Sequence, residues 1–280
     1  MTGAGGLDRT AQDTGNLVAL EHVNVRVPDP LLATTFYVSG LGFTRDPYLM
    51  VHTDNMWINL GQEQFHLPTG SPQIVRGTVG LVVPDLEALM VRLASVRERL
   101  SGTAFTFARE SDAVTVVCPW GNRLRCHAPG ATRLGIAYVE FAVPRGTGNG
   151  IARFYEHVVG APAAFERGAA RVRVGGRQAL VFRETAGDPP PYDGHHIAVY
   201  VADFSGPYRR LAERGLISEE NGEFQYRFTD IVDPEGGRAL FTVEHEVRSL
   251  THPMFRRPLV NRNPDQGVLG YVRGRDAFIP

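Results

Sequence analysis

Two histidines are the first candidates for chemistry, because they occupy the same position in two copies of an internal repeat. His22 begins a repeat segment at residues 22–29, and His196 begins the corresponding segment at residues 196–203. An imidazole binds divalent transition metals when neutral and exchanges protons near pH 7. A lone histidine in a strand usually has a packing or surface role, but its recurrence at one position favours a shared chemical role.

The repeat itself predicts the elements that position these residues. Each copy has an alternating, β-branched strand pattern, and aligning the copies on their final valines places His22, Thr78, Tyr138 and His196 at one position. The copies recur at intervals of roughly 56 to 60 residues. A helical stretch and short strands broken at glycine turns follow each first strand. Four β-α-β-β-β units therefore predict an α+β fold.

The size of the unit predicts how the chain is organised. A unit this short buries little apolar surface alone, so pairs of units must share a curved sheet. We expect a first module at residues 16–133 and a second at residues 134–247. Residues 1–15 are expected to be disordered or frayed, and residues 248–280 to form a C-terminal strap or lid.

Composition points to a small partner. The 280 residues are 43% hydrophobic and carry 29 basic against 30 acidic side chains, as in ordinary globular proteins. The net charge of −1 predicts no nucleic-acid partner, and the absence of a long apolar run predicts no membrane span. The two cysteines favour a reducing, cytoplasmic location. We expect a monomer or homodimer that binds a small molecule.

The repeat pattern resembles the vicinal oxygen chelate superfamily, which includes glyoxalases, bleomycin-resistance proteins and extradiol dioxygenases. Its motifs here are residues 22–29, 36–43, 196–203 and 233–236, and the likeness extends over about residues 18–246. It implies four βαβββ units that form two paired modules with curved, cup-shaped mixed sheets. The same scaffold carries lyases, isomerases, oxygenases, transferases and binding proteins, so it does not select a reaction.

The resemblance also implies a set of metal ligands. Each half-site in that superfamily combines a histidine near the start of a unit's first strand with a histidine or glutamate on its last strand. In the first unit these residues are His22 and His66. In the fourth unit they are His196 and Glu244, which would act as ligand or general base, with Glu246 as the next residue on the same face.

The two middle units lack such ligands. They carry Thr78 with Arg125, and Tyr138 with Leu180, at the corresponding positions. In the glyoxalase-like arrangement the first unit shares a cup with the fourth, and the second with the third. The sequence thus predicts one working site built from both ends of the chain and one decayed site. Arg125 would pair there with a carboxylate such as Glu140 or form an anion pocket.

Further residues are candidates for substrate contacts. Trp57 and Asn59 lie on the strand before His66 and, with Tyr48, are expected to line the cup. The arginine-rich tail is interpreted either as a strap across the sheets or as a lid. In the lid interpretation Arg257 or Arg262 clamps a substrate carboxylate.

This ligand set limits the metal and the reaction. Imidazoles with a carboxylate favour one divalent transition metal ion, Fe, Mn, Zn, Ni or Co, over calcium or magnesium. A substrate with two neighbouring oxygens would chelate this ion, and we expect a glyoxalase-like lyase or isomerase. The alternatives are a non-haem Fe(II) dioxygenase and a metal-free small-molecule binding or resistance protein.

Overall fold

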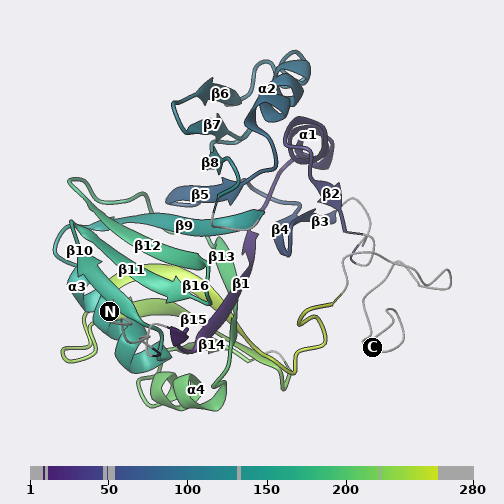
Figure 1. Ribbon diagram of the computed structural model, residues 1–280. Coiled ribbons are helices and arrows are strands. Elements are labelled where there is room, and N and C mark those ends of the chain that lie inside the picture. Colours follow the sequence, from purple (N-terminus) through teal and green to yellow (C-terminus); the bar gives the residue numbers. More distant parts are fainter. Residues whose placement is uncertain are drawn as a thin grey trace, which may run out of the picture.

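Two eight-stranded mixed sheets make up most of the protein, with short helices packed against them (Figure 1). A computed structural model describes residues 9, 12–46, 49, 54–130, 134–220 and 222–257. Within these residues, every helix is too short or too polar to span a lipid bilayer.

The elements follow the predicted order of four βαβββ units. The first unit contains β1 (Leu17–Asn24), α1 (Pro30–Ala33), the π-helical turn η2 (Thr34–Gly40), β2 (Thr44–Arg45), β3 (Asn55–Leu60) and β4 (Glu63–Pro68). The second contains β5 (Gly77–Val82), α2 (Leu86–Ser95), β6 (Thr106–Arg109), β7 (Ala113–Val117) and β8 (Arg123–His127). The third contains β9 (Gly135–Pro144), α3 (Gly148–Phe154), η3 (Tyr155–Val159), β10 (Ala163–Glu166), β11 (Ala169–Val174) and β12 (Gln178–Thr185). The fourth contains β13 (His196–Val201), α4 (Ser205–Ala212), β14 (Ile217–Glu219), β15 (Gln225–Val232) and β16 (Ala239–Ser249).

The sheets confirm the predicted pairing of the units. The first sheet has the order β14-β15-β16-β13-β1-β4-β3-β2 and joins the first unit to the fourth. The second sheet, β10-β11-β12-β9-β5-β8-β7-β6, joins the second unit to the third. Antiparallel pairs, β1 with β13 and β5 with β9, connect the two units in each sheet. The boundaries of the predicted modules stay predictions.

Aspartate caps explain why the helix begins where it does in the first two units. The side chain of Asp29 accepts hydrogen bonds from the backbone amides of Leu31 and Leu32 at the start of α1. Asp85 accepts the corresponding bonds from Glu87 and Ala88 at the start of α2. Each cap satisfies amides that have no partner inside the helix. The Pro-Asp end of the repeat is therefore a helix-start signal.

Aromatic side chains join the two sheets. Phe141 on β9 stacks on Phe182 of β12 at a centroid distance of 5.3 Å, and Phe241 of β16 contacts both rings. Because Phe241 belongs to the first sheet and the other two to the second, this cluster buries apolar area between them. The two sheets thus share one continuous hydrophobic core.

Close strand pairing at Gly77 gives a test of the second sheet. A Cβ atom at Gly77 would lie 1.7 Å from the carbonyl oxygen of Glu140 on β9. We expect Gly77→Ala to lower the free energy of unfolding by at least about 1–3 kcal/mol in chemical denaturation, because the backbones must separate. Gly130→Ala is the control, since nothing lies within 4 Å of its Cβ, and should change stability by less than about 0.5 kcal/mol. Equal effects would contradict this pairing.

Candidate metal centre

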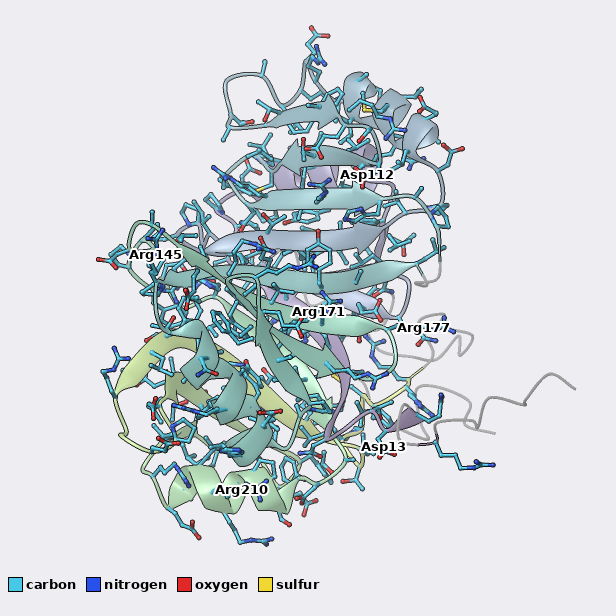
Figure 2. All side chains as sticks on the ribbon, turned by 60° about the vertical axis from the view of Figure 1, so that its left-hand side comes forward. Asp13, Asp112, Arg145, Arg171, Arg177 and Arg210 are labelled. Atoms are coloured by element: carbon cyan, nitrogen blue, oxygen red, sulfur yellow. The ribbon has the colours of Figure 1, made fainter. Side chains whose placement is uncertain are left out.

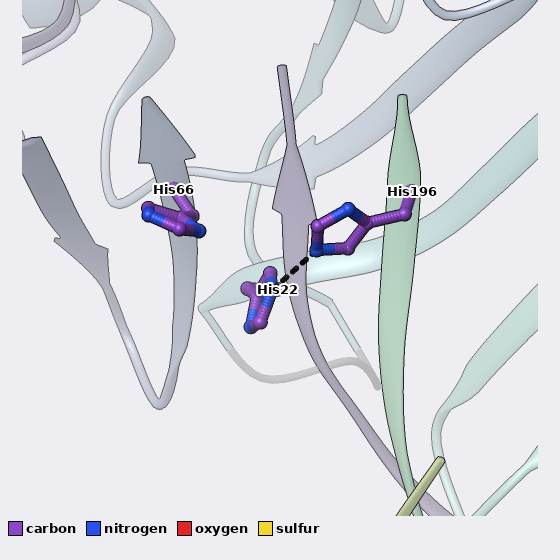
Figure 3. A group of neighbouring side chains, drawn as sticks. All are labelled: His22, His66 and His196. Carbon is purple, nitrogen blue, oxygen red and sulfur yellow. Dashed lines mark hydrogen bonds between the residues drawn. The ribbon is translucent and has the colours of Figure 1, made fainter. Parts of the chain in front are cut away.

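Three histidines from three adjacent strands converge on one face of the first sheet (Figure 3). Each offers a ring nitrogen, and the three nitrogens lie within 4.8 Å of one another. The register explains this geometry, because Asn24 on β1 pairs with both His66 on β4 and His196 on β13. His22 lies two residues earlier on β1 and so faces the same side.

The pocket around the imidazoles is mostly buried. His22 is 1% exposed and His196 is 7% exposed, whereas His66 is half-buried. The Trp57 indole stacks on His66 at a centroid distance of 3.9 Å and meets His22 edge-on at 4.9 Å. Trp57 therefore covers two of the three rings and limits their access to water.

Hydrogen bonds orient two of the rings. Glu21 Oε2 lies 2.8 Å from His22 Nδ1 and accepts a hydrogen bond from its N–H group, which leaves the lone pair of His22 Nε2 facing His196 Nε2 at 3.4 Å. His66 Nε2 donates to Asn55 Oδ1 at 2.5 Å, and its Nδ1 accepts from Asn24 Nδ2 at 2.6 Å. His22 thus presents a free lone pair to the centre, whereas both nitrogens of His66 are engaged by asparagines.

The strand register distinguishes the two candidate glutamates. In the first unit, His66 lies two residues beyond the strand partner of His22. In the fourth unit, Glu244 is itself the strand partner of His196, and Glu246 lies two residues beyond it. Glu246 therefore holds the position that corresponds to His66. Its Oε2 lies 3.5 Å from the ring nitrogen of His196 that faces His22, whereas Glu244 Oε1 lies 3.3 Å from the other nitrogen.

A chain of ion pairs borders the three imidazoles. Arg248 bridges Glu21 and Glu246 with contacts of 2.5 Å, and Arg227 bridges Glu246 and Glu244 with contacts of 2.6 Å. Arg227 also lies 3.4 Å from Glu219, so four carboxylates and two guanidiniums leave two negative charges in excess. This excess favours a bound cation beside the neutral nitrogen donors.

Burial and these charges set the protonation states. Burial lowers the pKa of His66 and of His196, and the nearby charges of Arg227 and Arg248 lower both further, so the two rings are neutral at pH 7. Burial opposes the ionisation of Glu21 and Glu246, but Arg248, His22 and a second neighbouring arginine together outweigh it and hold the pKa of both carboxyls below the usual value. Burial raises the pKa of Glu244 against the opposing effect of Arg227.

A cavity of about 440 Å³ lies beside the centre. Glu21, Gln64 and Tyr200 line it from the sheet, and residues 254–257 line it from the tail. Met254 packs against the pair formed by Leu49 and Trp57, so this part of the tail contacts β3. The choice between a strap and a lid stays a prediction.

The other predicted contact residues lie in different settings. Arg257 lines the cavity, but its guanidinium binds Asp46 at 2.7 and 3.3 Å, so a clamp on a substrate would have to replace this buried pair. Asn59 accepts a hydrogen bond from Gln64. Tyr48 and Arg262 lie outside the described residues.

The second cup differs from the expectation at two positions. Leu180 packs into the core, and the register instead places Val181 on the cup face, two residues beyond the strand partner of Tyr138. Arg125 pairs with Glu110 and Asp112 rather than with Glu140. Within the described residues, a cluster of three metal-binding side chains occurs in the first cup alone.

Three charged residues of the centre, Glu21, Arg227 and Arg248, were not predicted from the sequence. Glu21 precedes His22, and strict strand alternation places neighbours on opposite faces. A register shift between Leu20 and His22 breaks this alternation and brings the Glu21 carboxylate to the imidazole. Arg248 lies two residues after Glu246, just as Glu246 lies two residues after Glu244, and this spacing could have predicted its position. The position of Arg227 beside Glu246 depends on the pairing of β15 with β16, which the sequence does not reveal.

Comparisons with known proteins identify the fold. No protein-family model and no curated protein matches the sequence. Glyoxalase I from Zea mays is 13% identical in a match that covers 83% of this chain and 92% of that one, with a TM-score of 0.58. A protein from Bacillus subtilis strain 168 that is provisionally named a dioxygenase is 14% identical over 83% and 85% of the two chains, with a TM-score of 0.57. At these identities the likeness establishes the two-module, glyoxalase-like fold.

Removing Arg248 tests the ion-pair chain. Arg248→Met leaves two buried carboxylates without this guanidinium, so we expect metal-free protein to lose about 3–5 kcal/mol of unfolding free energy at pH 7. The pKa of Glu21 and Glu246 is depressed in the folded protein, so their contribution is complete above about pH 4.5 and is lost as the pH falls. The deficit measured by urea denaturation should therefore shrink at pH 4.

An exposed ion pair is the control for this measurement. Arg183→Met removes a half-exposed guanidinium from Glu140 and should cost less than about 1 kcal/mol at either pH. A deficit for Arg248→Met as small as that of Arg183→Met would show that the buried chain has no special importance for stability.

Proposed function

We propose that this protein is a divalent-metal-dependent enzyme of the vicinal oxygen chelate superfamily. It would act on a small organic substrate that approaches the ion through two neighbouring oxygens. The observation that carries the proposal is the convergence of His22, His66 and His196 from β1, β4 and β13 within 4.8 Å. Three imidazoles on a rigid sheet, beside an excess negative charge, fit a transition metal ion better than calcium or magnesium.

We assign the fourth ligand position to Glu246 and a proton-transfer role to Glu244. Glu246 corresponds to His66 in the strand register and lies on the side of His196 that faces His22. Glu244 is less buried, with 22% of its side chain exposed against 4% for Glu246, and can therefore meet a substrate more easily. This division gives the site one carboxylate for binding and a second for general base catalysis.

The chain's own residues supply the remaining requirements. A bound ion would act as a Lewis acid that stabilises negative charge on the substrate oxygens. Glu244 would accept a proton from substrate carbon at Oε2, since Arg227 binds its Oε1 and fixes the side chain. Trp57 would exclude water from the imidazoles. This proton-transfer chemistry favours a glyoxalase-like lyase or isomerase.

A second candidate, a non-haem Fe(II) dioxygenase, is favoured by one observation. Asn24 and Asn55 engage both nitrogens of His66. In contrast, His22 Nε2 and Glu246 Oε2 each lie within 3.5 Å of the same nitrogen, His196 Nε2. Two histidines and one carboxylate match the ligands of such oxygenases. Oxygen uptake with catechols and 1,3-diketones would support this candidate, whereas anaerobic conversion of 2-oxoaldehyde thiol adducts would support the first.

Metal content tests the proposal directly. Purified protein should carry close to one transition metal ion per chain by elemental mass spectrometry, and His22→Ala or His196→Ala should remove most of it, because each deletes a nitrogen donor. His157→Ala is the matched control, since His157 is exposed on η3 and should leave the metal content unchanged. Metal-free protein would instead favour a binding protein without metal. A metal content that His22→Ala does not alter would place the ion away from these histidines and contradict the proposal.

The two glutamates are separated by paired substitutions. Glu246→Gln should weaken metal binding by at least about 10–100-fold in a chelator competition assay. Substitution of a residue that only hydrogen-bonds to a metal ligand already causes a loss of this size, so the loss of a ligand should cost at least as much. Glu244→Gln should retain the metal but lower turnover by about 10²–10⁴-fold, since it removes a base. The reverse pattern would exchange the two roles.

A further inference from the structure

The second sheet carries a broad cavity on its cup face, distinct from the candidate metal centre. This cavity of about 840 Å³ lies over β10, β11 and β12 of the third unit. Its floor is apolar, because the lining residues Ala169 and Val181 belong to a buried cluster that also contains Ala179. We name it the arginine-rimmed cup, since five arginines also line it: Arg167, Arg171, Arg173, Arg177 and Arg183.

The strand register places these arginines around the floor. Arg171 pairs with Val181 and Arg173 with Ala179, so both side chains leave β11 on the cup face. The two Cα atoms are about 7 Å apart along the strand, so both guanidiniums can reach one anion. Arg177 lies in the turn between β11 and β12. Figure 2 shows it near the end of these strands, on the same side of the sheet as the label of Arg171.

Most of this charge has no partner among the described residues. Arg183 binds Glu140, and Arg173 donates to the backbone carbonyl of Asp13. Within the part of the chain that the structure describes, no carboxylate pairs with Arg167, Arg171 or Arg177.

The acidic lining does not balance this charge. Glu156 and Glu166 are the acidic residues of the lining, so the four arginines other than Arg183 leave two positive charges in excess. The whole chain has a net charge of −1, so this excess is a local property of the cup. Clustered cations over an apolar floor raise the electrostatic potential and attract an anion.

We propose that the arginine-rimmed cup binds a small organic phosphate, namely a phosphomonoester dianion joined to an apolar, aromatic group. Two excess positive charges match the charge of such a dianion, and the planar guanidinium forks of Arg171 and Arg177 bind phosphate oxygens in pairs. The alanine and valine side chains of the floor provide an apolar surface for the aromatic group. The volume also exceeds what inorganic phosphate alone would fill.

This ligand would bind without a metal ion. The position that corresponds to His66 in the second cup holds Arg125, which Glu110 and Asp112 already neutralise. The proposed site lies to the side of that residue, on the flank formed by β10–β12. It is thus independent of the function proposed for the first cup.

Binding of 1-naphthyl phosphate to the full-length, metal-stripped protein tests the proposal. Isothermal titration calorimetry at low ionic strength should detect one site that binds this probe more tightly than inorganic phosphate or 1-naphthol. Arg171→Gln combined with Arg177→Gln should weaken binding by at least about tenfold, because charge-assisted hydrogen bonds are lost. Both residues are exposed, so circular dichroism should show an unchanged fold.

Arg145→Gln is the matched control, since Arg145 is exposed and lies across the sheet from Arg171 and Arg177 (Figure 2). It should leave the affinity unchanged. Affinity that the double substitution does not reduce, or that Arg145→Gln reduces equally, would overturn the proposal. Inorganic phosphate that binds as tightly as the naphthyl ester would overturn the role of the apolar floor, and 1-naphthol that does so would overturn the role of the arginines.

Discussion

The antiparallel pairing of β1 with β13 is the constraint on which the candidate centre depends. His22 and His196 are 174 residues apart in the sequence, and only this pairing brings their imidazoles to a nitrogen separation of 3.4 Å. Closing so long a loop costs chain entropy, although the cost grows slowly with loop length. The parallel neighbours β4 and β16 extend the same sheet on both sides and add His66 and the two glutamates.

Electrostatics gives the centre its asymmetry. The first unit contributes two histidines to the cup, together with Glu21, which Arg248 binds. The fourth unit contributes one histidine, the carboxylates of Glu244 and Glu246, and both arginines that hold them. A buried carboxylate is costly unless a cation faces it, so the arginines keep Glu246 ionised inside the cup. The second cup carries the opposite sign of charge on its flank, where arginines outnumber carboxylates.

Much of this arrangement could be predicted from the sequence, because repetition encodes it. Equivalent strand positions identified His22 and His196, and the repeat fixed the βαβββ order and the α+β class that the sheets confirm. The carboxylate that corresponds to His66 was harder to place. The number of residues between the turn before the last strand and the corresponding position on that strand differs between the first and fourth units. Only the register shows that Glu246, rather than Glu244, corresponds to His66. Glu21 could not be predicted from alternation, because a register shift turns it toward the cup.

The central claim is that both ends of the chain build one metal centre. A crystal structure of metal-loaded protein, with anomalous diffraction recorded at the absorption edge of the metal, tests this claim most directly. We expect a single ion with nitrogen and oxygen ligands from His22, His66, His196 and Glu246 at about 2.0–2.3 Å. An ion bound elsewhere in the chain, with the three imidazoles still hydrogen-bonded as they are here, would contradict it.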